Sequence, residues 1–143
     1  MQLTRAADYA VRVMIHLASL PAGTRLPLGT LAAAIDVPES FLSKVLQSLT
    51  RAGLVASRRG TDGGFMLSPD ISNATMLDVI QAIDGPIQLN VCLSHDGSCA
   101  RSGTCPAHPV WLQAQEALVK VLSEAKVSEL GAQAHASPLL TVN

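Results

Sequence analysis

All three cysteines of the sequence lie in one short stretch that is rich in glycine and serine. They are Cys92, Cys99 and Cys105, and two residues separate the last of them from His108, which gives the spacing C-x6-C-x5-C-x2-H. Thiolates bind zinc, Cu(I) or iron–sulfur clusters, and an imidazole can complete such a ligand set. The alternative is one disulfide and a free thiol. The stretch predicts a metal or cluster site, and its spacing does not separate zinc from an iron–sulfur core.

The composition indicates a helical domain with an uneven charge distribution. The 143 residues are 48% hydrophobic but only 3% aromatic, which predicts an aliphatic core built mainly by helices. Residues 1–60 hold seven of the ten lysines and arginines and only three acidic residues, whereas residues 61–143 hold eight acidic residues. We therefore expect the first part of the chain to face a polyanion.

The first apolar run predicts neither a secretion signal nor a membrane span. It is interrupted by Asp8, Arg12 and His16. We expect a cytoplasmic protein with no membrane partner. In that compartment cysteines are more often ligands or redox sensors than disulfides.

The apolar periodicity of the first 52 residues indicates a helix-turn-helix. A first helix is expected from a Thr4 cap to about Leu20, a second over Thr30–Ile35, and a third over Glu39–Ala52. Phe41 is expected to point inward from the third helix. Its outward face carries small polar and cationic side chains that suit phosphates and base edges in a major groove: Ser40, Ser43, Lys44, Gln47 and Arg51. The alternative is the solvated face of an ordinary helix.

A β-hairpin is predicted directly after the third helix. Strands are expected over Leu54–Arg59 and Phe65–Leu67, joined by a turn that contains three glycines. A hairpin in this place is the wing of a winged helix, and its candidate DNA contacts are Arg58, Arg59, Thr61 and Gly63. For the two arginines, plain surface solubility is the alternative.

The rest of the chain predicts a further helix, the cysteine loop and a long helix that pairs with a second copy of the protein. Thr75 and Asp78 form a capping-box pattern before a helix that ends near Ile83. A long helix should begin at Pro109 and end near Ala125, and its apolar residues cover more than one stripe, which favours dimerisation. The expected fold is mainly α. Its parts are a winged helix-turn-helix domain (1–84), a cysteine-rich loop (85–108), a dimerisation helix (109–130) and a flexible tail (131–143).

The sequence resembles the Rrf-type bacterial winged-helix regulators, which include IscR, NsrR and RirA. Three pieces carry the resemblance, which spans residues 1 to about 130: the opening Met1–Arg12, the wing pattern R-G-x-x-G-G-F-x-L over residues 59–67, and the cysteine loop followed by His108 and Trp111. It implies a homodimer that binds an iron–sulfur cluster (2Fe–2S or 4Fe–4S) and controls transcription. Six residues separate the first two cysteines, where the family often has five.

For the fourth ligand, the resemblance leaves two candidates. His108 matches the histidine of IscR-like members, and Asp8 matches the acidic residue that NsrR-like members supply from the partner subunit. Asp8 also has a plain alternative role, since it lies four residues before Arg12 and can pair with it on the helix surface.

The function expected from these features is transcriptional repression controlled by a cluster on the three cysteines. The signal would be nitric oxide, redox state or iron and iron–sulfur status, and the target a pseudo-palindromic operator in double-stranded DNA. The alternative is a zinc-stabilised winged-helix module without redox sensing. An enzyme is not expected, because the sequence lacks a phosphate-binding loop, paired acids and a cysteine–histidine–carboxylate set in a pocket.

Overall fold

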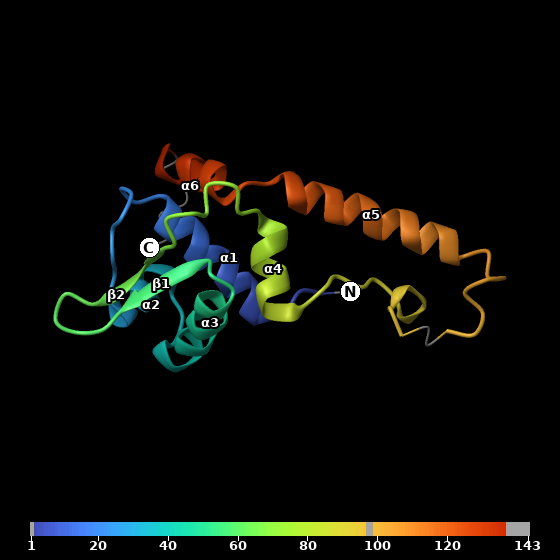
Figure 1. The fold of residues 1–143 in the computed structure, drawn as a ribbon, viewed down its shortest axis with the longest axis horizontal. Coiled ribbons are helices and arrows are strands. Elements are labelled where there is room, and N and C mark those ends of the chain that lie inside the picture. Colours follow the sequence, from blue (N-terminus) through green and yellow to red (C-terminus); the bar gives the residue numbers. More distant parts are fainter. Residues whose placement is uncertain (1, 97–98, 137–143) are drawn as a thin grey trace.

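The computed structural model describes residues 2–96 and 99–136 and is mainly α-helical, with one β-hairpin (Figure 1). The fold is a winged helix-turn-helix, as the sequence predicted. The elements follow the chain in this order: α1 (Arg5–Ala18), α2 (Leu28–Ile35), α3 (Glu39–Arg51), β1 (Val55–Arg58), β2 (Gly64–Leu67), α4 (Met76–Asp84), the 3₁₀ helix η1 (Val91–Leu93), α5 (His108–Glu124) and α6 (Val127–Ala136).

The body of the molecule is an aliphatic core between α1, α2, α3 and α4. Met14, Leu31, Leu42, Leu46 and Ile80 are among the residues that have no exposed side-chain surface. The buried residues of α1 and α3 recur at helical spacing, which explains why the sequence pattern located both helices. α1 begins where predicted, because the Thr4 side chain accepts a hydrogen bond from the backbone N–H of Ala7 at 3.1 Å.

Two details of the helix-turn-helix differ from the sequence-based expectation. α2 begins at Leu28 rather than Thr30, because Pro27 holds the extended conformation of an N-cap and Gly29 is tolerated inside the first turn. Phe41 was expected to point inward, but it is 38% exposed and packs edge-on against Tyr9, with the ring centroids 5.3 Å apart. The inward side of α3 is already filled by leucine and valine.

The wing is a two-stranded antiparallel hairpin, and a short segment at Leu26 pairs with its second strand. Val55 pairs with Leu67 and Arg58 with Gly64. Leu26, just before α2, exchanges two backbone hydrogen bonds with Phe65, at 2.8 and 2.9 Å. Gly64 makes this possible, since a side chain there would run into the Leu26 carbonyl group. The wing is therefore fixed to the helix-turn-helix at its base.

The cysteine loop and α5 form an arm that projects from the body and returns to it (Figure 1). The loop leaves the body at the C-terminal end of α4. α5 runs back, and the Ala125 carbonyl accepts a hydrogen bond from the Met76 N–H at 2.9 Å, at the N-terminal end of the same helix. The capping box predicted for Thr75 and Asp78 is present there.

The C-terminal segment corrects one expectation. A flexible tail was expected from Gly131, but α6 continues to Ala136 and packs against α1, with Val127 and Gly131 buried. The contact needs a small residue, and glycine provides it. Residues 137–143 of the expected tail lie outside the described residues. No helix in the described part of the chain is long and apolar enough to span a membrane.

Candidate nucleic-acid interface and cysteine loop

A polar groove runs between α3 and the wing. It is lined from α3 by Ser43, Gln47, Thr50 and Arg51, and from the hairpin by Ser57, Arg58, Arg59 and Phe65. Five of these eight residues were predicted DNA contacts, and the fold places them around one hollow. The helix and the hairpin therefore present hydrogen-bonding groups and positive charge to the same hollow.

The remaining predicted contacts lie on the same two elements. Ser40 and Lys44 are exposed on α3, and Thr61 is exposed in the turn of the wing, where Gly63 is half-buried. A side chain at Gly63 would overlap the backbone of Arg58 and Arg59, so glycine keeps this turn tight. Lys44, Arg58 and Arg59 form no salt bridge with a carboxylate of the described residues. Their charges are available to an anionic partner.

The sequence analysis missed three residues that line the groove: Thr50, Ser57 and Phe65. The Thr50 hydroxyl donates to the Leu46 carbonyl at 2.7 Å, which leaves it less free to contact a ligand. Ser57 and Phe65 are opposite each other in the hairpin. Cross-strand partners share one face of a hairpin, so the pairing of Ser57 with Phe65 is the signal that could have placed both beside the groove.

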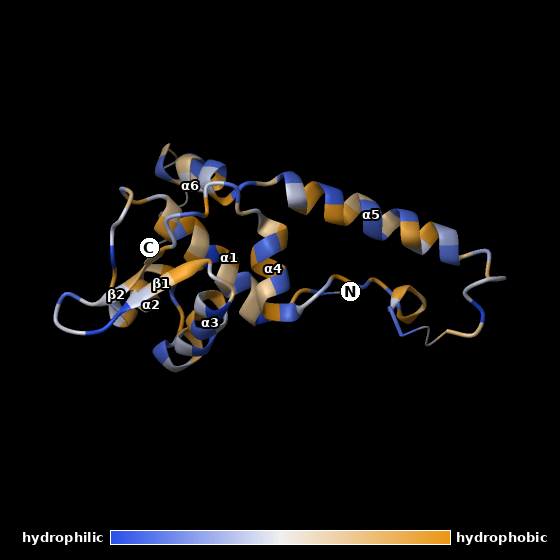
Figure 2. Ribbon diagram, in the orientation of Figure 1, coloured by the Kyte–Doolittle hydropathy of each residue, from blue (hydrophilic) through white to orange (hydrophobic). Residues whose placement is uncertain are grey.

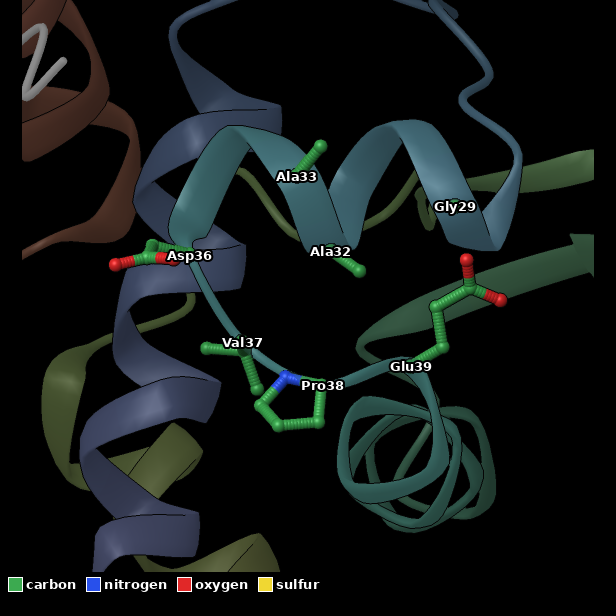
Figure 3. A pocket seen from close by; sticks show the side chains of 7 residues that line it. All are labelled: Gly29, Ala32, Ala33, Asp36, Val37, Pro38 and Glu39. Atoms are coloured by element: carbon green, nitrogen blue, oxygen red, sulfur yellow. The ribbon is translucent and has the colours of Figure 1, made fainter.

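A second, shallow hollow lies at the turn of the helix-turn-helix (Figure 3). Gly29, Ala32 and Ala33 border it from α2, and Asp36, Val37, Pro38 and Glu39 border it from the turn and the start of α3. Asp36 has a left-handed backbone, with φ 56°, which turns the chain sharply between the two helices. The small side chains of α2 let the two helices approach, so this hollow belongs to the turn rather than to a binding site.

The three cysteines are free thiols in the loop of the arm. Cys92 lies in η1, and Cys105 lies three residues before α5, where its carbonyl accepts from the His108 N–H at 3.1 Å. All three are half-buried. Within residues 2–96 and 99–136, no three cysteine, histidine or acidic side chains come together as metal ligands. A shared cofactor would therefore require the loop to close around it.

The two candidates for a fourth ligand have different surroundings. Asp8 is half-exposed, and its carboxylate forms an ion pair with the Arg12 guanidinium at 2.9 Å. The same guanidinium lies 5.7 Å from the centroid of the Tyr9 ring. His108 begins α5, and its Nδ1 atom is buried without a hydrogen-bond partner among the described residues. Three thiols and an unsatisfied imidazole nitrogen suit a soft metal or an iron–sulfur cluster.

The surface of α5 is unusually apolar for an exposed helix. The helix has no buried residue, and Val110, Trp111, Leu112 and Val121 are between 41% and 64% exposed. Figure 2 shows hydrophobic residues along its length, outside the body. Val110, Ala114, Ala117 and Val121 follow each other at steps of four, three and four, so they form one exposed stripe.

A helix-turn-helix and a wing that share one cationic groove define a winged-helix DNA-binding transcriptional regulator. The chain belongs to the Rrf2 family, described as iron-dependent transcriptional regulators, whose model matches residues 3–133. The relatives are regulators of transcription, and this protein is a regulator rather than an enzyme.

Two curated relatives agree with this assignment. A protein of Mycobacterium tuberculosis (strain H37Rv), named as a helix-turn-helix transcriptional regulator, is 34% identical over 131 residues, which are 91% of this chain and 81% of the relative. The regulator IscR of Klebsiella pneumoniae (strain 342) is 30% identical over 130 residues, which are 91% and 79% of the two chains.

Two solved structures share the fold. CymR, the global cysteine regulator of Bacillus subtilis, superposes with a TM-score of 0.75 at 26% identity and covers 93% of this chain and 98% of its own. IscR of T. potens gives a TM-score of 0.76 at 20% identity, covering 96% and 91%. The winged helix and the arm therefore occur together in known regulators.

Proposed function

We infer that this protein is a dimeric repressor that reads a pseudo-palindromic operator and responds to a cluster bound by its arm. The observation that supports operator reading is the groove between α3 and the wing. Ser40, Ser43 and Gln47 would contact base edges in the major groove, because hydroxyl and amide groups can hydrogen-bond to bases there. Lys44, Arg51, Arg58 and Arg59 would bind phosphates, with Thr61 and Gly63 at the tip of the wing.

A dimer would place two such grooves on one face of the DNA. The exposed stripe Val110–Ala114–Ala117–Val121 supports pairing through α5, since two valines and two alanines allow helices to pack closely. Two-fold symmetry of the protein would then correspond to two half-sites related by the same symmetry.

An iron–sulfur cluster, of the 2Fe–2S or 4Fe–4S type, is the proposed cofactor. Cys92, Cys99 and Cys105 would hold it, with Asp8 of the partner subunit or His108 as the fourth ligand. The unsatisfied Nδ1 of His108 supports the histidine, whereas the ion pair with Arg12 would have to open before Asp8 could bind. A bound cluster would supply a redox-active, gas-sensitive centre, and the three cysteines would have to converge to hold it.

The signal would be nitric oxide, redox state or iron supply. One relative with this fold is named as a global cysteine regulator, so the fold does not fix the signal by itself. The alternative is a structural zinc ion on the same donors, which suits C-x6-C-x5-C-x2-H equally well by ligand type.

Anaerobic purification, followed by a visible spectrum and assays of iron, zinc and acid-labile sulfide, tests the cofactor. We expect a brown protein with iron and sulfide, and Cys92→Ala should lose the colour while keeping its helical content. A colourless protein with one zinc ion per chain would contradict the sensing proposal and support the structural-zinc alternative. Selection of operators from genomic fragments, followed by binding assays with and without nitric oxide, then tests the DNA and signal parts separately.

A further inference from the structure

The start of α1 is hydrogen-bonded to the last residue before the cysteine loop. Thr4 donates its hydroxyl to the Asp84 carboxylate at 2.6 Å and its backbone N–H to the other carboxylate oxygen at 3.3 Å. These two residues are 80 positions apart in the sequence. Asp84 ends α4, and Gly85, which follows it at φ 76°, opens the loop.

Thr4 also organises the first turn of α1. The hydroxyl that donates to Asp84 accepts from the Ala7 N–H at 3.1 Å, and the Thr4 carbonyl accepts from the Asp8 N–H, also at 3.1 Å. The carboxylate therefore fixes the hydroxyl hydrogen on its own side, which leaves a lone pair for the helix. A continuous path of hydrogen bonds leads from the loop entrance, through Thr4, to the backbone of Asp8.

The other end of α4 is attached as well. The backbone at Met76 and Ala74 bonds to Ala125 and Val127, both at 2.9 Å, where the arm returns to the body. Between these two attachments, Val79 and Ile80 of α4 are fully buried, and α4 packs against both α1 and α3. A movement of the C-terminal end of α4 relative to the start of α1 therefore has to strain or break the Thr4–Asp84 contact.

We propose that Asp84 is a positioning residue, and that its contact with Thr4 is a latch that holds α1, and with it Asp8, against the entrance of the cysteine loop. The role of the latch rests on the proposed function, because the latch would connect the state of the cysteine loop to the helices that position α3. If Asp8 ligates the partner's cluster, each latch also joins the two cluster sites of a dimer.

The first experiment measures backbone hydrogen exchange in the full-length protein without cofactor. The variants are Asp84→Ala, which removes both acceptors, Thr4→Val, which keeps the size of the side chain but loses the hydroxyl, and Asp70→Ala, which removes an exposed carboxylate elsewhere. We expect both latch variants to raise exchange at residues 4–8 and also at residues 85–90, and the control to change neither. Thr4→Val is the decisive variant if Asp84→Ala fails to fold, because it leaves α4 intact.

In Thr4→Val, faster exchange confined to the first turn of α1 would overturn the proposal, because it would show a local cap rather than a latch. This result does not depend on a cluster or on DNA, so it separates the latch from the proposed function.

The second experiment compares operator affinity with and without the cluster. The wild type should show a coupling of at least about fivefold, and Asp84→Ala should reduce this ratio towards one while iron and sulfide per chain stay unchanged. An unchanged ratio in a fully loaded variant would also overturn the latch. A wild type that binds no cluster or no operator would instead contradict the proposed function, and the exchange data would still decide the latch.

Discussion

At the scale of single residues, the positive charge beside the groove is carried by a few side chains that pair with no carboxylate of the described residues. Arg58 and Arg59 are exposed, and neither pairs with a carboxylate in the described part of the chain. Each phosphate that a cation neutralises releases counterions from DNA, so the number of contacts determines how steeply affinity falls with salt. The wing arginines can therefore be tested one at a time.

Replacing Arg59 with glutamine should weaken operator binding and flatten its salt dependence. In a dimer two phosphate contacts are lost, so the slope of log K against log salt should change by roughly 1.8. Fluorescence anisotropy over a range of KCl concentrations measures both quantities. Lys126→Gln removes the same charge far from the groove and should keep the slope; an unchanged slope in Arg59→Gln would exclude a phosphate contact.

His16 should make the stability of the domain depend on pH. Burial on α1 lowers its pKa from the ordinary value of 6.5, so the unfolded chain takes up the proton more readily than the folded one. Neutral His16 therefore makes its full contribution to the free energy of unfolding above pH 6.5, and this contribution is lost as the pH falls below that value. Urea denaturation between about pH 5 and 8 should show a smaller acid-induced loss in His16→Gln than in the wild type. Equal losses would contradict this assignment.

At the scale of elements, α6 is joined to α1 by a contact between backbones. Gly131 is buried, and a Cβ atom built on it would lie 2.5–2.7 Å from the Cβ, carbonyl carbon and carbonyl oxygen of Ala18. Because two of these atoms are backbone, α1 cannot make room by a change of rotamer. The close approach explains how a helix of small and polar residues is held to the body.

The substitution Gly131→Ala separates helix propensity from packing. Propensity alone predicts a gain of about 1 kcal/mol in the free energy of unfolding, whereas overpacking against Ala18 predicts a loss of about 1–3 kcal/mol. We expect the loss to dominate, and urea denaturation measures it. Gly103→Ala, in a turn of the cysteine loop, controls for the added methyl group alone, since nothing lies within 4 Å of its added Cβ. A stabilised Gly131→Ala would show that α6 does not pack as described.

The same contact shows why some elements could be predicted from the sequence and α6 could not. α1 and α3 repeat large aliphatic residues at helical spacing, and Thr4 and the Thr75–Asp78 pair mark helix starts, so local patterns were sufficient. α6 is held by a glycine against a backbone 113 positions earlier, and no local pattern encodes that. Phe41 fits the inward pattern of α3 but lies beside Tyr9 at the surface, because its neighbours already fill the core.

The candidate site could also be predicted only in part from the sequence. The groove could be predicted, since a helix followed directly by a hairpin must bring Gln47, Arg51 and Arg58 close together. The arrangement of the cysteines could not be predicted, because the loop between them has few apolar residues to fix its course. The spacing of Cys92, Cys99 and Cys105 specifies which donors are available but not how they converge.

At the scale of the whole molecule, the arm exposes apolar surface that the body does not cover. The stripe of Val110, Ala114, Ala117 and Val121 lies along α5, and exposed patches of this kind on a regulator usually mark an interface. A second α5 is the partner that the two-fold DNA site would require.

If α5 pairs with a second copy as proposed, an aspartate at Val121 should convert the dimer into a monomer. Burying a carboxylate from each subunit in an apolar interface without a partner charge is strongly unfavourable. Operator affinity should fall by at least tenfold, because each DNA-binding domain then binds alone. Sedimentation velocity measures the assembly. Ser123→Asp adds the same charge on the opposite side of α5, where Ser123 is exposed, and should remain dimeric. A Val121→Asp dimer would place the interface elsewhere.

The path of the arm makes it, in topological terms, an insertion. It leaves the body at one end of α4 and returns at the other, and a helix of nine residues is only about 13 Å long. A linker of about five residues spans such a distance. Such a linker would close the winged helix with α6 without the arm, so the helices around the groove and the loop that carries the cysteines are separable in topology. An arm with different chemistry can be inserted at the same two points without redesigning the core.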